Sequence, residues 1–231
     1  AFNPRRLGQG ASEIINPDDP WVTILLKRAG AANIRGKVYE ENAHVFVAWR
    51  TPIGEVWYDV LTRQWHTRGT LNTDTSRYTA MVQVGPADSA RVFVGDADGV
   101  FDEMSRDYTS EHMADADTMG TEIVREFTAI APALPNRIAI NTVRLESAKG
   151  VGLAAGQGSD PIVRMRFSVD GGNTWSPWRD RPLGVQGRYD QPTIWRRCGR
   201  AGRQDMVFWF SKSDPVKEAY LGVVINEDEA A

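Results

Sequence analysis

The sequence contains one cysteine, Cys198, among 231 residues. An internal disulfide is therefore excluded, and such a chain fits assembly in a reducing compartment. Long apolar runs are also missing, so no segment predicts a membrane span, and the opening residues 2–6 lack the apolar stretch of a signal peptide. Neither charge sign dominates, because 27 Lys and Arg stand against 30 Asp and Glu. Overall charge thus indicates no particular partner.

Signatures of catalysis are equally scarce. The histidines His44, His66 and His112 lie far apart, which favours strand or loop positions over a metal site. The Gly-rich stretch 150–158 lacks the spacing of a dinucleotide-binding loop and is expected to be a surface loop. Cys198 has arginine neighbours that could lower its pKa, but an inert packed thiol is the favoured interpretation. We therefore expect no enzyme, no metal and no cofactor.

Asp96-x-Asp98-Gly99 resembles half of a calcium-binding loop. The remaining ligand positions of such a loop are incomplete. An Asp-Gly hairpin turn accounts for the same residues and is the favoured interpretation.

The residues that are abundant favour strands and turns. The chain has 8 Trp, 6 Tyr and 8 Phe together with 21 Gly and 12 Pro, a composition typical of an all-β protein. Four strands are expected in the first unit, at Lys37–Tyr39, His44–Arg50, Glu55–Asp59 and Gln64–Arg68. Four meandering strands over about forty residues are the size of one propeller blade.

Two further units follow. The second is expected to have strands at 78–84, 91–95, 99–104 and 122–128, although the spacing of 122–128 also permits a helical turn. The third is expected to have strands at 138–146, 163–168, 193–197, 206–211 and 221–225. The prediction is therefore an all-β fold of β-propeller-like blades, each a four-stranded antiparallel sheet, with a partial propeller as an alternative. The predicted domains are an N-terminal arm or partial blade at 1–36, a propeller-like domain at 37–226 and an acidic tail at 227–231. Near residue 20 the pattern fits a short helix or a buried strand.

The most specific local motif runs from Ser168 to Trp175. It matches Ser-x-Asp-x-Gly-x-Thr-Trp, the Asp-box, which predicts a tight hairpin turn. Ser168 and Asp170 can bind backbone N–H groups, and Gly172 can take a positive φ. Thr174 and Trp175 would begin the next strand. These five residues are expected to have a structural role without binding a substrate.

Charge is unevenly distributed along the chain. Residues 96–126 contain ten acidic residues and two arginines, whereas residues 161–212 contain ten basic and four acidic residues. Three interpretations stay open: complementary surfaces between subunits, contact with DNA phosphate, or a solvated surface. The candidate interface or DNA-facing residues are Arg179, Arg181, Arg188, Arg196, Arg197, Arg200 and Arg203.

An ordered set of motifs carries a family resemblance. The set comprises the loop 150–158, the Ser168–Trp175 motif, Pro182-Leu183-Gly184-x-x-Gly187-x-Tyr189, Trp195-Arg196-Arg197-x-Gly199 and Ser213-Asp214-Pro215-Val216. Trp57-Tyr58-Asp59-x-x-Thr62-x-Gln64-Trp65 adds to it upstream. Together they resemble the packaged-DNA stabilisation proteins of short-tailed phages, also called tail nozzle or head-completion proteins.

The resemblance implies a structural virion protein without enzymatic activity, assembled in the host cytoplasm and not associated with a membrane. Its copies would form a ring of six below the portal and its head-to-tail adaptor. The ring would continue the DNA channel, retain packaged DNA and receive the distal tail protein. The alternative is a glycan-binding or sialidase-like Asp-box propeller, although only one box is present.

Overall fold

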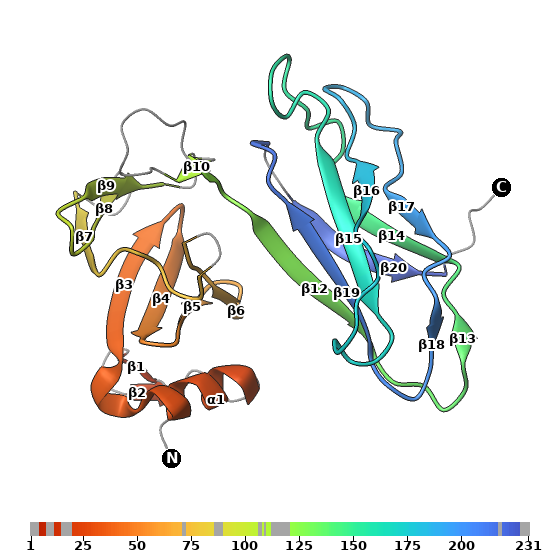
Figure 1. Cartoon of the computed structure of the whole chain (residues 1–231). Coiled ribbons are helices and arrows are strands. Elements are labelled where there is room, and N and C mark those ends of the chain that lie inside the picture. The colour runs from red at the N-terminus through yellow and green to blue at the C-terminus, as the bar shows by residue number, and fades with distance from the viewer. Residues whose placement is uncertain are drawn as a thin grey trace. The chain divides into compact units, whose positions relative to one another are not determined.

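A computed structural model describes residues 5–7, 12–14, 20–70, 73–85, 90–105, 108, 110–111, 121–216 and 219–226. The chain forms two compact units (Figure 1). Unit 1 comprises residues 1–108 and 114–117, and unit 2 comprises residues 109–113 and 118–231. The predicted domain at 37–226 thus spans both units, and the predicted tail at 227–231 lies outside the described residues. No described helix has the length and apolar character needed to cross a membrane.

Unit 1 is built on a four-stranded antiparallel sheet. Its strands, in spatial order, are β3 (Arg35–Glu41), β4 (His44–Thr51), β5 (Gly54–Asp59) and β6 (Gln64–Thr67). The four strands expected from the sequence are therefore present, joined by tight turns. Two short strands, β1 (Arg5–Leu7) and β2 (Ser12–Ile14), pair with each other upstream.

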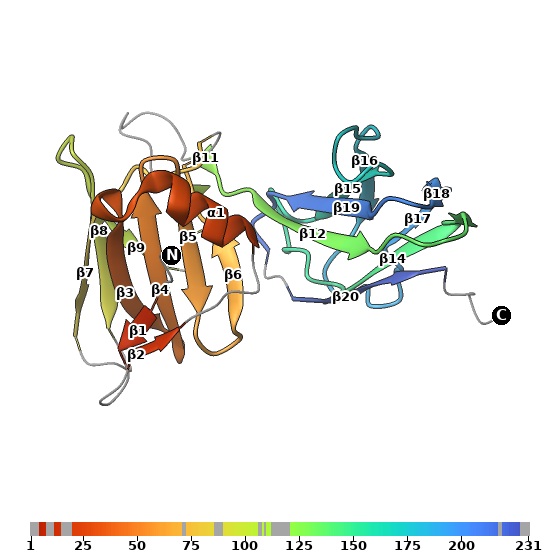
Figure 2. The same ribbon diagram turned by 90° about the horizontal axis from the view of Figure 1, so that it is seen from below.

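Helix α1 (Pro20–Ala29) packs on one face of this sheet (Figure 2). Val22 and Leu26, one turn apart, are buried against Trp49 and Val56. This spacing is that of a helix, which decides between the two interpretations left open for this segment. Basic residues occupy the last turn, and Gly30 follows with φ 77°, as is common after a helix. A short 3-10 helix, η1 (Ala31–Asn33), leads into β3.

The opposite face of the sheet packs on a second, three-stranded sheet. Its strands are β7 (Ala80–Val84), β8 (Arg91–Gly95) and β9 (Phe101–Met104). Tyr39, Phe46 and Trp57 are buried with Val92 between the two sheets. Burying each of these large side chains contributes roughly 1.5–3 kcal/mol.

Unit 2 contains two larger sheets that share one core. The four-stranded sheet has the order β12 (Arg125–Ala131), β19 (Met206–Lys212), β15 (Ile162–Ser168) and β16 (Arg179–Pro182). The three-stranded sheet has the order β17 (Ile194–Arg196), β14 (Thr142–Ser147) and β20 (Tyr220–Ile225). Two-stranded pairs are formed by β13 (Ile138–Ala139) with β18 (Arg200–Ala201) and by β10 (Ser110–Glu111) with β11 (Thr121–Glu122).

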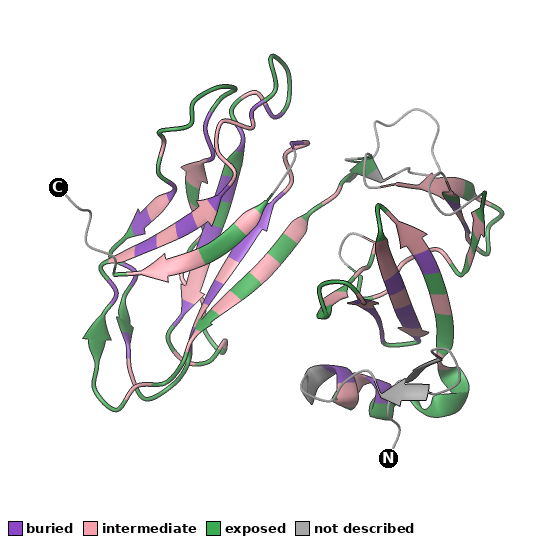
Figure 3. Ribbon diagram, turned by 180° about the vertical axis from the view of Figure 1, so that it is seen from behind, coloured by how far each residue is buried: buried purple, intermediate pink, exposed green. Residues whose placement is uncertain are grey.

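Alternating burial along these strands places every second side chain in the core of unit 2 (Figure 3). Val143 and Leu145 of β14 meet Met165 of β15 and Phe208 of β19, all completely buried. Trp195 of β17 lies in the same cluster, with its ring T-shaped to that of Phe210 at 5.6 Å between centroids. Unit 2 is therefore a sandwich, with two antiparallel sheets facing each other across one apolar layer.

The predicted all-β class, with four-stranded antiparallel sheets, is confirmed, whereas the propeller arrangement is not. The strand expected at 122–128 to complete the second blade is instead β12, which pairs with β19 in unit 2. The strand expected at 138–146 divides into β13 and β14, because Ile140 N–H donates to Gly199 O and the chain changes partner there. Strands expected in one third blade are thus shared between the two facing sheets.

Candidate functional site

The turn after β15 is held by the side chains of Ser168 and Asp170. Ser168 Oγ donates to Asp170 Oδ1 at 2.6 Å and accepts from Gly172 N–H at 2.8 Å. Asp170 accepts from the backbone N–H and the hydroxyl of Thr174 at 2.8 and 2.6 Å. Gly172 has φ 99°. These bonds close the loop locally, while its assignment to the Asp-box class stays a prediction.

The same bonds set the charge of the turn. The hydroxyl groups of Ser168 and Thr174 lower the pKa of Asp170 to about 2, because hydrogen bonds to a carboxylate favour its ionised form. Asp170 is therefore ionised at neutral pH. Its oxygens accept bonds from Ser168 and Thr174 of its own turn, and its structural role stays a prediction.

Trp175 differs from its expected position. The next strand, β16, begins at Arg179, so Thr174 and Trp175 precede it in the loop. The Trp175 ring lies 5.3 Å from that of Trp209, edge to face. Trp209 belongs to β19, where it alternates with the core residues Phe208 and Phe210. The indole of Trp175 therefore covers the outer face of the four-stranded sheet rather than the core.

Two of the seven candidate arginines hold the edge of the sandwich together. Arg181 Nε donates to Ile194 O at 2.7 Å, and an Nη of Arg179 donates to Arg196 O. Both bonds cross from β16 of one sheet to β17 of the other. In return Trp195 Nε1 donates to Arg179 O at 2.7 Å. These two arginines are thus committed to carbonyl groups within unit 2.

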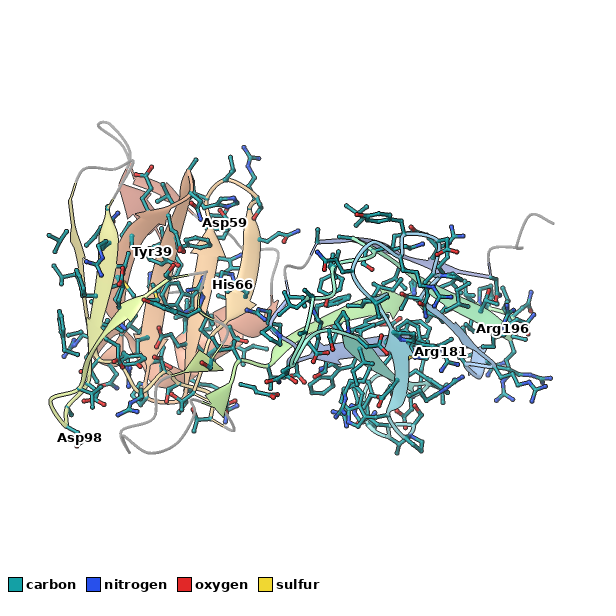
Figure 4. All side chains as sticks on the ribbon, turned by 90° about the horizontal axis from the view of Figure 1, so that it is seen from above. Tyr39, Asp59, His66, Asp98, Arg181 and Arg196 are labelled. Atoms are coloured by element: carbon teal, nitrogen blue, oxygen red, sulfur yellow. The ribbon has the colours of Figure 1, made fainter. Side chains whose placement is uncertain are left out.

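The other candidate arginines are exposed. Arg188 Nε lies 3.8 Å from Asp190 Oδ1, and both side chains are mostly open to solvent, so this pair contributes little to stability. Figure 4 labels Arg196 on β17 and Arg181 on β16. Arg196 and Arg197 precede the turn that leads to Arg200 on β18, and Arg203 follows β18.

Four exposed arginines thus lie at and next to the β17–β18 connection, and this group is called the basic end below. Its members are Arg196, Arg197, Arg200 and Arg203. Its backbone is fixed, since Arg197 N–H donates to Asn141 O at 2.8 Å. Asn226 binds the same region through Asn141 N–H at 2.7 Å. Arginines held on such a frame can receive acidic groups with little loss of backbone freedom.

The acidic segment 96–126 is different, because three of its described carboxylates have partners within unit 1. Arg77 binds Asp96 Oδ2 at 2.6 Å, and Tyr78 OH donates to Asp102 Oδ2 at 2.6 Å. Glu103 is paired with Arg91. The exposed carboxylates among the described residues of this segment are Asp98, at the tip of the β8–β9 hairpin (Figure 4), Glu122, which accepts from Gln157, and Glu126 of β12.

The calcium-like motif is a turn. Asp96 Oδ1 accepts from the N–H groups of Asp98 and Val100, both at 2.9 Å, and Gly99 has φ 86°. Within the described residues no group of three or more His, Cys, Asp or Glu could hold a metal ion. The side chain that would coordinate a cation instead caps the hairpin.

Cys198 and the described histidines lie in structural positions. Cys198 is buried in the core of unit 2, and this burial raises the pKa of its thiol although Arg179 lies 3.7 Å away. His44 Nδ1, at the start of β4, lies 2.7 Å from Oδ2 of Asp59 at the end of β5. His66 Nε2 accepts from Arg68 Nε at 3.1 Å, and its ring stacks on Trp57. His112 lies outside the described residues.

Unit 1 contains a buried charge cluster that was not predicted from the sequence. Glu55 is completely buried, with Lys37 Nζ and Arg50 Nη1 each 3.8 Å from its carboxylate. Burial raises the pKa of Glu55, and the two cations oppose this effect. Both cations also donate to Tyr78 O. The cluster therefore ties the segment before β7 to the first sheet, and alternation along β5 gave no sign of it.

Comparison with known proteins finds a similarity for part of the chain. Residues 124–226 match the family model described as Bacteriophage P22 Gp10, beta-sandwich. They include both sheets of the sandwich, and the match supports a structural protein of a phage. No curated protein matches the chain. A solved exo-β-1,3-galactanase from Phanerochaete chrysosporium, with galactose, aligns over 85% of this chain at 8% identity with a TM-score of 0.21. The aligned part spans 57% of that structure's chain.

Proposed function

We propose, from the resemblance of residues 124–226 to the β-sandwich of phage P22 Gp10, that this chain is a virion protein of a short-tailed phage. It belongs to the tail nozzle, part of the connector between head and tail. There it retains packaged DNA and links the portal adaptor to the distal tail protein. Its role is mechanical and not enzymatic.

The construction of unit 2 supports a mechanical role. Its two sheets share one core, and Arg179 and Arg181 join their edges through strand carbonyl groups. The loop after β15 is closed by its own side chains. A sandwich with locked edges and loops changes shape little under load, as a connector requires.

We further propose that copies assemble as a ring of six around the DNA channel. The resemblance to packaged-DNA stabilisation proteins carries this proposal, and the match of residues 124–226 to a phage protein family supports it. The basic end provides one surface of the right charge for an acidic subunit neighbour or for DNA phosphate. In the assembled particle the chain would contact the adaptor on one side and the distal tail protein on the other.

Imaging of the intact particle tests the position of the chain. Particles would be produced from a genome that lacks this coding sequence, with the chain supplied in trans and carrying a small fused tag. We expect tag density below the portal adaptor, in a ring. Tag density on the capsid shell or on distal fibres would refute a connector role.

Retention of DNA tests the role itself. Without the chain, filled heads are expected to lose DNA, measured as nuclease-sensitive DNA released from purified particles. The chain supplied in trans should restore retention. Particles that keep their DNA without the chain would show that retention depends on another component.

A further inference from the structure

Arg166 lies on the outer face of the four-stranded sheet of unit 2, enclosed by three indole rings. Its guanidinium carbon is 4.2 Å from the ring centre of Trp209, 4.6 Å from that of Trp178 and 4.8 Å from that of Trp175. Trp209 faces Arg166 directly across the β15–β19 pair. The two other rings come from the loop closed by Asp170. Strand register and turn chemistry thus build one cluster, named here the Trp–Arg cluster.

The guanidinium of Arg166 has no acceptor among the described residues. Its Nε is buried without a hydrogen-bond partner, and no described carboxylate forms an ion pair with it. Each indole face contributes about 0.5–2 kcal/mol of attraction to the cation. Aromatic rings do not replace the acceptors for which a guanidinium has five N–H donors. The positive charge of Arg166 therefore lacks a carboxylate or carbonyl partner among the described residues.

The neighbouring arginines, unlike Arg166, have partners for their guanidinium groups. Arg164, two residues earlier on the same face, lies 3.8 Å from Asp180. Arg179 and Arg181 donate to strand carbonyl groups. Asp170, the nearest acidic residue in the loop, is bound to Ser168 and Thr174. The sequence around Arg166 thus supplies partners to its neighbours and none to Arg166.

We propose that the Trp–Arg cluster binds a carboxylate side chain of a partner polypeptide. Three ring centres within 4.8 Å of its carbon restrict the rotation of the guanidinium, and its planar fork matches both oxygens of a carboxylate. Trp and Arg are also the residue types that carry most binding energy at protein interfaces. The rings would exclude water around the new ion pair.

The number of cations on this face favours a single carboxylate over a nucleic acid. Proteins that bind a phosphate backbone neutralise several charges at once. Here Arg164 has Asp180 beside it, and Glu126 of β12 shares this face through Ser211 of β19. Arg166 is the cation of this face without a carboxylate partner among the described residues. The proposal concerns the outer face of unit 2 and holds whether or not the chain belongs to a tail connector.

Nuclear magnetic resonance of the full chain tests the proposal. The indole N–H signals of the three cluster tryptophans and the Nε–H signal of Arg166 would be assigned from single substitutions. The probe is the peptide acetyl-Gly-Glu-Gly-Glu-Gly-amide, titrated at constant ionic strength. We expect saturable shifts at these four signals. The matched peptide with Gln in place of Glu should bind about tenfold or more weakly, because bonds to charged partners are the stronger ones.

Two variants separate the cluster from its surroundings. Arg166→Gln should weaken binding of the Glu peptide about tenfold or more, while Arg188→Gln, at an exposed arginine of unit 2 outside the cluster, should change it by less than about twofold. If Arg166→Gln does not fold, Arg166→Lys keeps the charge without the planar fork and should bind at least about fivefold more weakly. Equal binding of the Glu and Gln peptides, or shifts away from the cluster, would overturn the proposal. Tighter binding of a thymidine hexanucleotide at these signals would also overturn it.

Discussion

At the residue scale, the loop after β15 depends on Asp170 and Gly172 for different reasons. Asp170 contributes a carboxylate whose oxygens accept hydrogen bonds from Ser168 and Thr174. Gly172 contributes a backbone with φ 99°, a conformation that L side chains rarely adopt. Either contribution can be removed alone, so the two can be measured separately.

Gly172→Val is expected to lower the free energy of unfolding of unit 2 by about 1–3 kcal/mol, because valine is strained at this φ. Ser168→Ala, which removes one shared hydroxyl, should cost about 1 kcal/mol. Gly222→Val in β20 is the matched control, since Gly222 has an ordinary φ and open space around its Cα. Chemical denaturation provides the measurement. Equal effects of the two valine substitutions would contradict the strain at Gly172.

His66 makes unit 1 sensitive to acid. Burial, with the positive charge of Arg68 nearby, lowers its pKa to about 4, whereas an unfolded histidine titrates near 6.5. Between these values the unfolded chain binds more protons than the folded one. The stabilisation by neutral His66 is therefore complete above about pH 6.5 and declines as pH falls toward 4, by at most about 1.4 kcal/mol per pH unit.

The test is thermal unfolding of unit 1 between pH 7.5 and 4.5. His66→Gln keeps an acceptor for Arg68 but cannot titrate, so its unfolding temperature should depend less on pH over this range than that of the unmodified chain. Identical pH dependence of the two proteins would show that another group is responsible.

The sequence allowed prediction of interactions that are local along the chain. Ser168, Asp170 and Gly172 lie within five residues, and their turn chemistry is visible in the pattern itself. The enclosure of Arg166 was not visible, because Trp209 comes from a distant strand. Alternation along β15 indicated only that Arg164 and Arg166 share a face.

At the scale of elements, the edge of the sandwich is fixed by side chains rather than by strand pairing. β16 and β17 belong to different sheets, and Arg181 bridges them through Ile194 O. Arg181→Gln should therefore destabilise unit 2 by about 1.5–3 kcal/mol, since it removes a charged donor from a strand carbonyl. Arg188→Gln, at a side chain 61% exposed, should change stability by less than about 0.5 kcal/mol. Urea unfolding of both variants compares them, and equal losses would argue against a bridging role.

Strand positions were predicted more accurately than strand partners. The β3–β6 meander was correct because sequential strands joined by short turns usually pair. β12 was assigned to the wrong sheet, because its partner β19 follows it by more than seventy residues. Hydrophobic alternation shows which face of a strand is buried and says nothing about which sheet buries it.

At the scale of the whole molecule, the acidic and the basic segment differ in how far their charges are paired internally. Asp96, Asp102 and Glu103 are bound to partners within unit 1, so their contribution to an external field is reduced. The basic end of unit 2 is exposed. An attraction between copies would therefore depend on the basic end more than on the described part of the acidic segment.

Self-association is the last prediction, and it follows from the proposed ring. Light scattering at rising protein concentration should show oligomers that dissociate when NaCl is raised from 50 to 500 mM, because salt screens exposed charges. Replacing Arg197, Arg200 and Arg203 together by Gln should reproduce the effect of salt. The control is Arg63→Gln, at an exposed turn of unit 1, which should associate normally. A strict monomer at high concentration, also with the portal adaptor present, would contradict the proposed ring. Association that persists in the triple variant would place the contact away from the basic end.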